Sequence, residues 1–174
     1  YLEVMEGMHV VDACAGAGGK SLQISALMNN TGRITALDTK NHKLKELQKR
    51  ASRAGISNVY PKPVRNNAIK GLYNKADRLL LDAPCSGLGT LRRSPYSKWH
   101  LTPEFVVKIR ETQQFILTSY APICKVGGLM VYATCSILPS ENEEQITTFL
   151  ATEFGQKFEL VRQQSILPQD GMGD

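Results

Sequence analysis

Short apolar segments alternate with amphipathic ones along the chain, and this alternation most restricts its fold. The segments with strand character are 9–15, 33–38, 58–64, 77–82 and 127–135, and helical patterns occupy 20–28, 44–54, 103–120 and 140–150. Such an order predicts an α/β fold with a mostly parallel sheet and helices on both of its faces. Ligands of such sheets bind beyond the carboxyl ends of the strands, so functional residues are expected there.

Local signals predict where several helices begin and end. Gly55 follows an amphipathic segment and is expected to end that helix. Thr102, followed by a proline, has the pattern of an N-cap. Ser140 and Glu143 have the spacing of a capping box for the last helix, and a short final strand is expected around 157–161.

The size and composition of the chain predict one domain. The 174 residues are 42% hydrophobic, which is enough for a single core spanning 1–174. No apolar run is long enough to span a membrane and the N-terminus does not resemble a signal peptide, so we expect a cytoplasmic protein without a membrane partner. Because the chain begins with Tyr1 rather than a methionine, we expect a piece of a longer protein.

Four cysteines are distributed without a metal-binding pattern. Cys14, Cys85, Cys124 and Cys135 form no CxxC pair and have no histidines at zinc spacing. We therefore expect no metal site. In a cytosolic chain these cysteines are expected to be free thiols, each either a buried apolar residue or a reactive group.

The loop DACAGAGGKS, at 12–21, is compatible with three ligands. A dinucleotide fingerprint fails because Ser21 stands where the third glycine belongs, and a P-loop lacks its first glycine, which is replaced by Cys14. The third ligand is S-adenosylmethionine, whose ribose hydroxyls need a carboxylate at the end of the next strand. Asp38 stands at that place. This combination favours S-adenosylmethionine, although a P-loop NTPase and a purely structural turn stay open at this point.

Two cysteines stand where predicted neighbouring strands end, and they suggest covalent catalysis. Cys85 follows LLLDAP and Cys135 ends VYATC, so both could face one pocket. A pyrimidine ring becomes nucleophilic at C5 after a thiolate has added to C6. The C5 proton must then be removed, which requires a second group able to act as a base.

The motifs together resemble the RNA 5-methylcytosine methyltransferases of the Nop2/Sun family, including bacterial ribosomal RNA enzymes. The resemblance is carried by DACAGAGGK, LDAPCSGLGTLRRSP, KW, QQ at 113–114 and YATCSILPSENEEQI, and it extends from about Gly7 to Leu167. The joint presence of DAPCSG and ATCS is its most specific part. It implies a Rossmann-like class I S-adenosylmethionine-dependent methyltransferase that acts on cytosine C5 in RNA, with ribosomal RNA expected before transfer RNA.

The resemblance also implies roles for particular residues. Cys135 would attack C6, Cys85 would act in proton removal or product release, Asp82 would hold and polarise the cytosine, and Lys20 would reach the active site. The implied cofactor-binding residues are Ala13, Cys14, Ala15, Gly16, Ala17, Gly18, Gly19, Lys20, Asp38, Lys43, Asn67 and Asp82.

Three positions depart from the family pattern. Ala17 replaces a common proline, Lys43 a frequent arginine, and Asn67 an aspartate that contacts adenine. Asparagine could still bond the adenine with a different set of donors and acceptors. The family's upstream RNA-binding region and last sheet strand are expected to be missing, so we predict a catalytic core that binds RNA weakly by itself.

A basic, aromatic segment follows the DAPCSG motif. Arg92, Arg93, Lys98 and Trp99 are suited to phosphates and stacked bases and are predicted to bind RNA, although a solvated loop would have the same composition. A non-catalytic RNA-binding module would not need the cysteines. In DNA cytosine methyltransferases the PC-motif cysteine attacks, which would make Cys85 the nucleophile.

Overall fold

A computed structural model describes residues 1–64 and 69–166 of the chain. Asn67 therefore lies outside the described residues. The chain forms two compact units, one of Tyr1–Asp82 with Ser119–Tyr132 and one of Ala83–Thr118 with Ala133–Asp174. None of the helices in the described part is long and apolar enough to cross a membrane. The expectation of a single domain stays a prediction.

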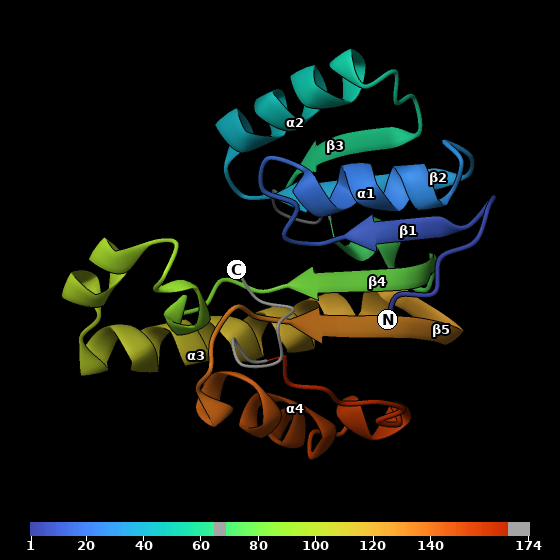
Figure 1. Ribbon diagram of the computed structural model, residues 1–174. Helices are drawn as coiled ribbons and strands as arrows, with labels where there is room; N and C mark the ends of the chain where they lie inside the picture. The colour runs from blue at the N-terminus through green and yellow to red at the C-terminus, as the bar shows by residue number, and fades with distance from the viewer. Residues whose placement is uncertain (65–68, 167–174) are drawn as a thin grey trace. The chain divides into compact units, whose positions relative to one another are not determined.

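A five-stranded sheet forms the centre of the first unit (Figure 1). Its strands are β1 (His9–Asp12), β2 (Arg33–Asp38), β3 (Val59–Pro63), β4 (Ala76–Asp82) and β5 (Cys124–Ala133), of which the last residue of β5 belongs to the second unit. The order is β3-β2-β1-β4-β5. β2 pairs in parallel with β1 and β3, β1 pairs in parallel with β4, and the arrows of β4 and β5 point the same way in Figure 1. The predicted α/β fold with a parallel sheet is confirmed, and its strand order is that of the Rossmann-like class.

The central strand β1 is hydrogen-bonded on both edges. Val11 is paired with Thr35 of β2 and with Leu79 of β4. Val10 and Val11 have no exposed surface. β-branched apolar side chains favour such a covered strand, because they pack well on a pleated surface.

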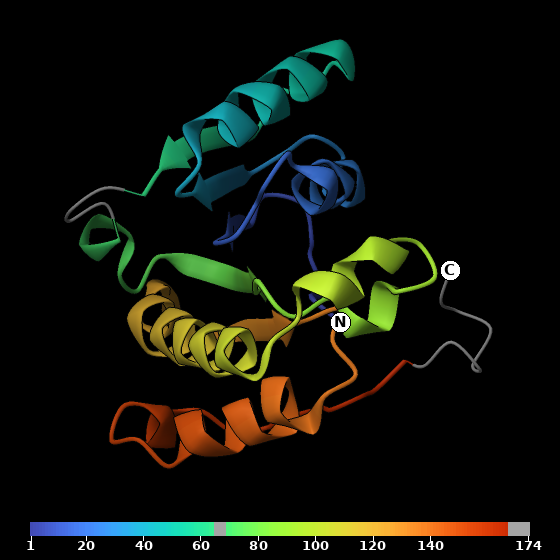
Figure 2. The same cartoon turned by 90° about the vertical axis from the view of Figure 1, so that its left-hand side faces the viewer.

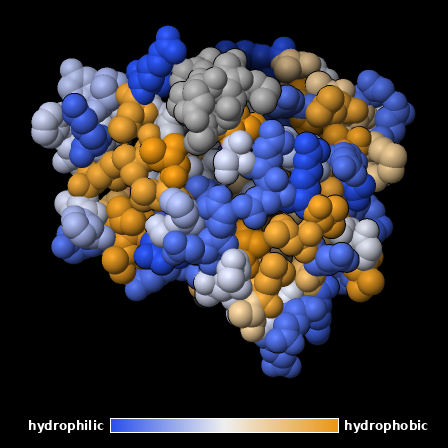
Figure 3. Space-filling model, turned by 60° about the horizontal axis from the view of Figure 1, so that its bottom comes forward, coloured by the Kyte–Doolittle hydropathy of each residue, from blue (hydrophilic) through white to orange (hydrophobic). Residues whose placement is uncertain are grey.

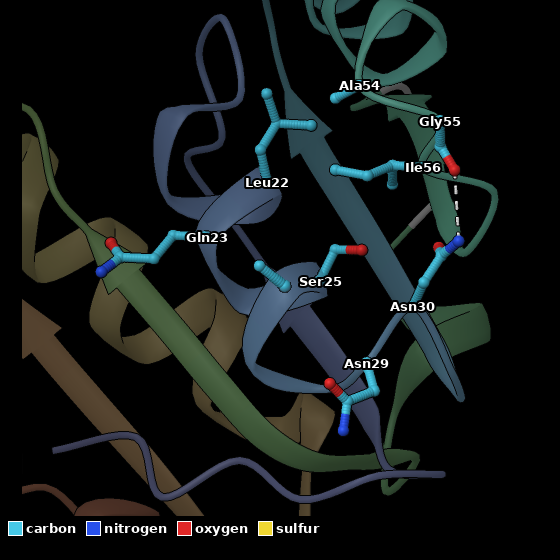
Figure 4. Close-up of a pocket in the computed structure, with 9 residues that line it drawn as sticks. Leu22, Gln23, Ser25, Asn29, Asn30, Ala54, Gly55 and Ile56 are labelled. Carbon is cyan, nitrogen blue, oxygen red and sulfur yellow. Dashed lines mark hydrogen bonds between the residues drawn. The ribbon is translucent and has the colours of Figure 1, made fainter.

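Two helices connect the first three strands, as Figure 2 shows from another side. Helix α1 (Gly19–Leu27) follows β1, and α2 (Asn41–Arg53) follows β2. Leu22 of α1 and Ile56 after α2 line one surface cavity of about 560 Å³ (Figure 4), so both helices lie on the same face of the sheet. Gly55 follows the end of α2 with a left-handed φ of 67°, as predicted.

An apolar cluster fills the space between α1 and the sheet. Ile24 and Met28 pack against Val10, Ile34 and Leu80 from three strands. Burial of side chains of this kind stabilises a fold by about 1.5–3 kcal/mol each. On the face drawn in Figure 3, apolar side chains reach the surface in several patches separated by hydrophilic ones.

The second unit contains most of α3 (Pro103–Tyr120) and all of α4 (Glu143–Leu150). The N–H of Phe105 donates to Oγ1 of Thr102 over 3.2 Å, so the predicted N-cap is confirmed. Phe149 of α4 packs edge-on against Phe158, with ring centroids 5.5 Å apart.

Two local predictions in this unit are wrong. Ser140 does not cap α4, because it lies in the 3-10 turn Pro139–Glu141 and the helix begins only at Glu143. Asn142 interrupts the helical backbone with φ −118° and ψ −98°. No strand forms at 157–161, where the ring of Phe158 packs on Phe149 and the following chain is irregular.

The turn before β2 offers a stability test. A Cβ at Gly32, where φ is +65°, would lie 2.4 Å from the carbonyl oxygen of Met8, whereas a Cβ at Gly7, where φ is +78°, would meet nothing within 4 Å. Gly7→Ala should therefore cost only the left-handed backbone penalty, about 1–2 kcal/mol. Gly32→Ala should cost about 2–4 kcal/mol because a backbone clash is added. Urea unfolding measures both, and equal losses would contradict the close packing at Gly32.

Candidate active site

The glycine-rich loop at the end of β1 is shaped by backbone contacts. The N–H of Ala15 donates to the carbonyl oxygen of Leu37 over 2.9 Å, which ties the loop to β2. Gly16 and Gly18 have φ values of +55° and +87°. A Cβ at Gly18 would lie 2.5 Å from Cγ of Leu47 in α2, so both the conformation and the space require glycine there. The loop is therefore a narrow turn between β1 and α1.

Asp38 holds this loop from the end of β2. Its Oδ2 accepts the N–H of Gly16 over 2.9 Å, and its Oδ1 accepts the N–H of Lys40 over 2.6 Å. An ionised carboxylate can accept about four hydrogen bonds, so acceptor capacity remains for a ligand. Arg50 of α2 donates from Nη1 to the carbonyl oxygen of Ala17 over 2.9 Å. Sequence reasoning missed Arg50, since an arginine on a basic helix carries no signal of a loop contact.

Two carboxylates lie near the amino end of α1. Asp12 is fully buried and accepts a 2.6 Å hydrogen bond from Oγ of Ser21, and burial raises the pKa of its carboxyl to about 6. Asp82, at the end of β4, forms an ion pair with Lys20, whose Nζ lies 2.6 Å from Oδ2 of Asp82. Both partners of this pair are partly exposed, so it contributes at most about 1 kcal/mol to stability. The first unit thus brings together the predicted residues Lys20, Asp38, Asp82 and the glycine loop.

Cys14 of the loop is held in its neutral form. Burial, and then the nearby charges of Asp12, Asp38 and Asp82, raise the pKa of the Cys14 thiol to about 12. Burial likewise raises the pKa of Tyr120, which lies near Cys14 and Asp38, to about 12. At neutral pH Cys14 is a small apolar wall residue of the loop and not a nucleophile.

The second unit brings Cys85 and Cys135 into contact. Their sulfur atoms are 3.1 Å apart, and the N–H of Cys135 lies 3.3 Å from Sγ of Cys85. The hydrogen bond to Cys135, followed by burial, raises the pKa of the Cys85 thiol far above its usual range. Cys85 is therefore held as a thiol at neutral pH, and Cys135 is the exposed member of the pair. A thiol that donates to a neighbouring sulfur stabilises the thiolate form of that neighbour.

Hydrogen bonds join the two loops that carry these cysteines. The N–H of Ala83 donates to the carbonyl oxygen of Ala133, and the N–H of Gly89 donates to that of Cys135, each over 2.9 Å. A Cβ at Gly89 would lie 2.7 Å from the oxygen of Cys135, so only glycine permits this approach. Glu141 and Gln113 lie behind these loops. Both belong to motifs that carry the family resemblance, but the sequence assigned them no role because they look like polar surface residues.

The predicted RNA-binding segment lies in the second unit as a group of exposed side chains. Arg92, Arg93 and Lys98 are exposed, and Nζ of Lys98 lies 4.9 Å from the centroid of the Trp99 ring. Tyr96, which was not predicted, is 79% exposed and Trp99 is 75% exposed. Exposed rings beside cations are suited to base stacking and phosphate contact.

Lys43 lies half-buried on α2. Within 1–64 and 69–166, no group of three or more His, Cys, Asp or Glu side chains could hold a metal ion. The roles assigned to Lys43 and Asn67 stay predictions.

A protein-family model for the 16S rRNA methyltransferase RsmB/F family matches residues 1–170. The chain belongs to this family. The prediction made from the DAPCSG and ATCS motifs, a family of ribosomal RNA methyltransferases, is thereby confirmed.

Individual relatives agree with the RsmB/F family model. A probable ribosomal RNA small subunit methyltransferase B from Bacillus subtilis is 41% identical over 143 residues, which are 81% of this chain and 32% of the relative. A ribosomal RNA small subunit methyltransferase F from Serratia proteamaculans is 38% identical over 82% of this chain and 30% of its own length. The chain thus spans about a third of these relatives.

A solved structure supports the same relationship. The crystal structure of NSun6 from Pyrococcus horikoshii with SFG is 30% identical and has a TM-score of 0.77. The similarity covers 86% of this chain and 38% of that one.

The four thiols should differ in their reactivity. Thiolates react with iodoacetamide, and raised pKa values hold Cys14, Cys85 and Cys124 as thiols. At pH 8, Cys135 should be alkylated at least about ten times faster than each of the others, as measured by peptide mass spectrometry. The difference should vanish in guanidinium chloride. Faster alkylation of Cys85 would contradict the proposed location of the proton.

Proposed function

We propose that the protein transfers a methyl group from S-adenosylmethionine to C5 of a cytosine in RNA, through a covalent bond between Cys135 and C6. The main support is the 3.1 Å separation of the Cys85 and Cys135 sulfur atoms, with Cys85 protonated. Membership of the RsmB/F family makes ribosomal RNA the first substrate to test, with transfer RNA as the second.

The proposed cofactor-binding residues are those of the loop 13–20, Asp38 and Asp82. Lys43 and Asn67 are proposed as further cofactor-binding residues. The residues fit S-adenosylmethionine, because the loop is a narrow turn and Asp38 keeps acceptor capacity for ribose hydroxyls beyond its two backbone bonds. When bound, S-adenosylmethionine supplies an electrophilic methyl group. The chain's own residues position it, and Asp82 also polarises the cytosine, with Lys20 at its carboxylate.

Cys135 is the nucleophile of the reaction. Its thiolate forms a bond to C6 of the cytosine, which makes C5 nucleophilic toward the methyl group. After the methyl group has been transferred, the proton on C5 leaves to a base and the bond between Cys135 and C6 breaks.

Cys85 assists the departure of Cys135. The thiol proton of Cys85 stabilises the departing thiolate in the same way as it stabilises the free one, since the two sulfur atoms are in contact. Arg92, Arg93, Lys98 and Trp99 hold the RNA near the thiols through phosphate contacts and stacking.

Asp38 should be required for cofactor binding. Asp38→Ala removes the ribose acceptor and the contact with Gly16, so affinity for S-adenosylmethionine should fall by about 100-fold or more. Calorimetry measures it, with Glu46→Ala on α2 as the control that should bind normally. ATP is titrated in parallel: tight ATP binding without S-adenosylmethionine binding would identify the loop as an NTPase loop and overturn the proposal.

The two cysteines should give opposite phenotypes. Cys135→Ala should abolish methyl transfer without forming a covalent complex. Cys85→Ala should accumulate a protein–RNA adduct, visible as a retarded band on a denaturing gel. If Cys85→Ala instead prevents adduct formation and Cys135→Ala retains activity, the attacking residue is Cys85, as in DNA cytosine methyltransferases. If the wild type transfers no methyl group and both variants bind RNA as it does, the protein is a non-catalytic RNA-binding module.

A further inference from the structure

A buried carboxylate lies behind the two thiol-bearing loops. The side chain of Glu141, in the turn Pro139–Glu141, has no exposed surface. Its Oε2 accepts the backbone N–H of Ser86 over 2.8 Å and Nε2 of Gln113 over 3.0 Å. Its Oε1 accepts Oγ of Ser136 over 2.6 Å. Three donors from separate parts of the chain therefore converge on one carboxylate.

Two of these donors directly follow the cysteines. Ser86 comes after Cys85, and Ser136 comes after Cys135. The two serine hydroxyl oxygens also lie 3.1 Å from each other. Glu141 thus forms a hydrogen bond with the residue that follows each thiol.

A third anchor reaches the carboxylate from α3. Gln113 has no exposed surface, and its Nε2 donates to the carbonyl oxygen of Pro84 over 2.9 Å as well as to Glu141. Pro84 precedes Cys85 directly. The Cys85 loop is therefore held on both sides of the thiol, by Gln113 at Pro84 and by Glu141 at Ser86.

The carboxylate is charged in the folded protein. Burial raises the pKa of Glu141, but hydrogen bonds from Ser136, Ser86 and Gln113 lower it by more, so the pKa lies below its usual range. Hydrogen bonds to an ionised acceptor are roughly twice as strong as neutral ones, and a buried charge with these donors removed is costly. The charge therefore strengthens the bonds that hold both loops.

We propose that Glu141 is a positioning residue that sets the distance between the thiols of Cys85 and Cys135. This inference rests on the proposed function, in which Cys85 must stay in contact with Cys135 to assist its attack and departure. A small displacement of a reacting group can lower a rate about 100-fold. Loss of the negative charge should therefore separate the sulfur atoms without removing either of them.

The separation of the thiols can be measured without any methyl transfer. Oxidised glutathione is the oxidant: its S–S bond breaks, a bond forms between Cys85 and Cys135, and two molecules of reduced glutathione are released. The equilibrium constant reports how closely the folded protein holds the two sulfur atoms. Peptide mass spectrometry verifies that the disulfide joins these two cysteines.

Glu141→Gln is the test variant, because it keeps the shape and removes the charge. Its thiol–disulfide equilibrium constant should be at least about tenfold lower than that of the wild type, since less contact means a lower effective concentration. Its kcat for RNA methylation should fall about 100-fold, with KM for RNA and affinity for S-adenosylmethionine unchanged.

Two controls separate positioning from general stability. Glu144→Gln removes a partly exposed charge from the next turn, where Glu144 pairs with Arg110, and it should change none of these quantities. Phe149→Leu weakens the packing of α4 and should lower the melting temperature while leaving the equilibrium constant and kcat intact.

The outcomes are distinct. An equilibrium constant that is unchanged in Glu141→Gln would overturn the positioning role, whatever happens to activity. A lowered constant together with a lowered kcat supports it. If the wild type transfers no methyl group, the proposed function is overturned. A lowered thiol–disulfide equilibrium constant in Glu141→Gln would then still show that Glu141 sets the distance between the thiols.

Discussion

Hydrogen bonding of β1 on both of its edges is the constraint on which the first unit depends. A strand that is paired on both edges has no free edge, so its chain can leave the sheet only at its end. The N–H groups of Ala13 and Ala15 still donate to Leu80 of β4 and Leu37 of β2 after β1 has ended. The glycine loop is therefore fixed from two strands at once. Asp38 adds its carboxylate at the same edge of the sheet, so the strand order itself brings together the residues that we propose to bind the cofactor.

In residues 83–118 and 133–166, the described part of the second unit, the structure forms no separate sheet that could position the two thiols. Its thiol loops are irregular, and irregular segments need side-chain hydrogen bonds in place of a strand ladder. Glu141 and Gln113 supply them from inside the unit. One carboxylate can anchor both loops, because several donors converge on it and its charge strengthens each hydrogen bond.

The fold was largely predictable because the apolar patterns were strong. The strand at 33–38 has the predicted bounds, and 77–82 is one residue longer in the structure. The glycine loop and the two cysteines that we propose as reactive also lie where the sequence placed them, just after strand ends. Glu141 and Gln113 were not predicted as site residues, because burial of a polar side chain depends on donors that are distant in sequence. The capping box at Ser140 failed for a related reason: Glu141 turns inward, and the helix starts after it.

The boundary between the two units has a consequence for the thiols. It falls between Asp82 and Ala83 and again between Tyr132 and Ala133, just ahead of each cysteine-bearing loop. Both sulfur atoms are therefore on the same side of both boundaries. The contact between Cys85 and Cys135 therefore lies within one compact unit, and a displacement of that unit as a whole would move the proposed nucleophile and its proposed proton donor together.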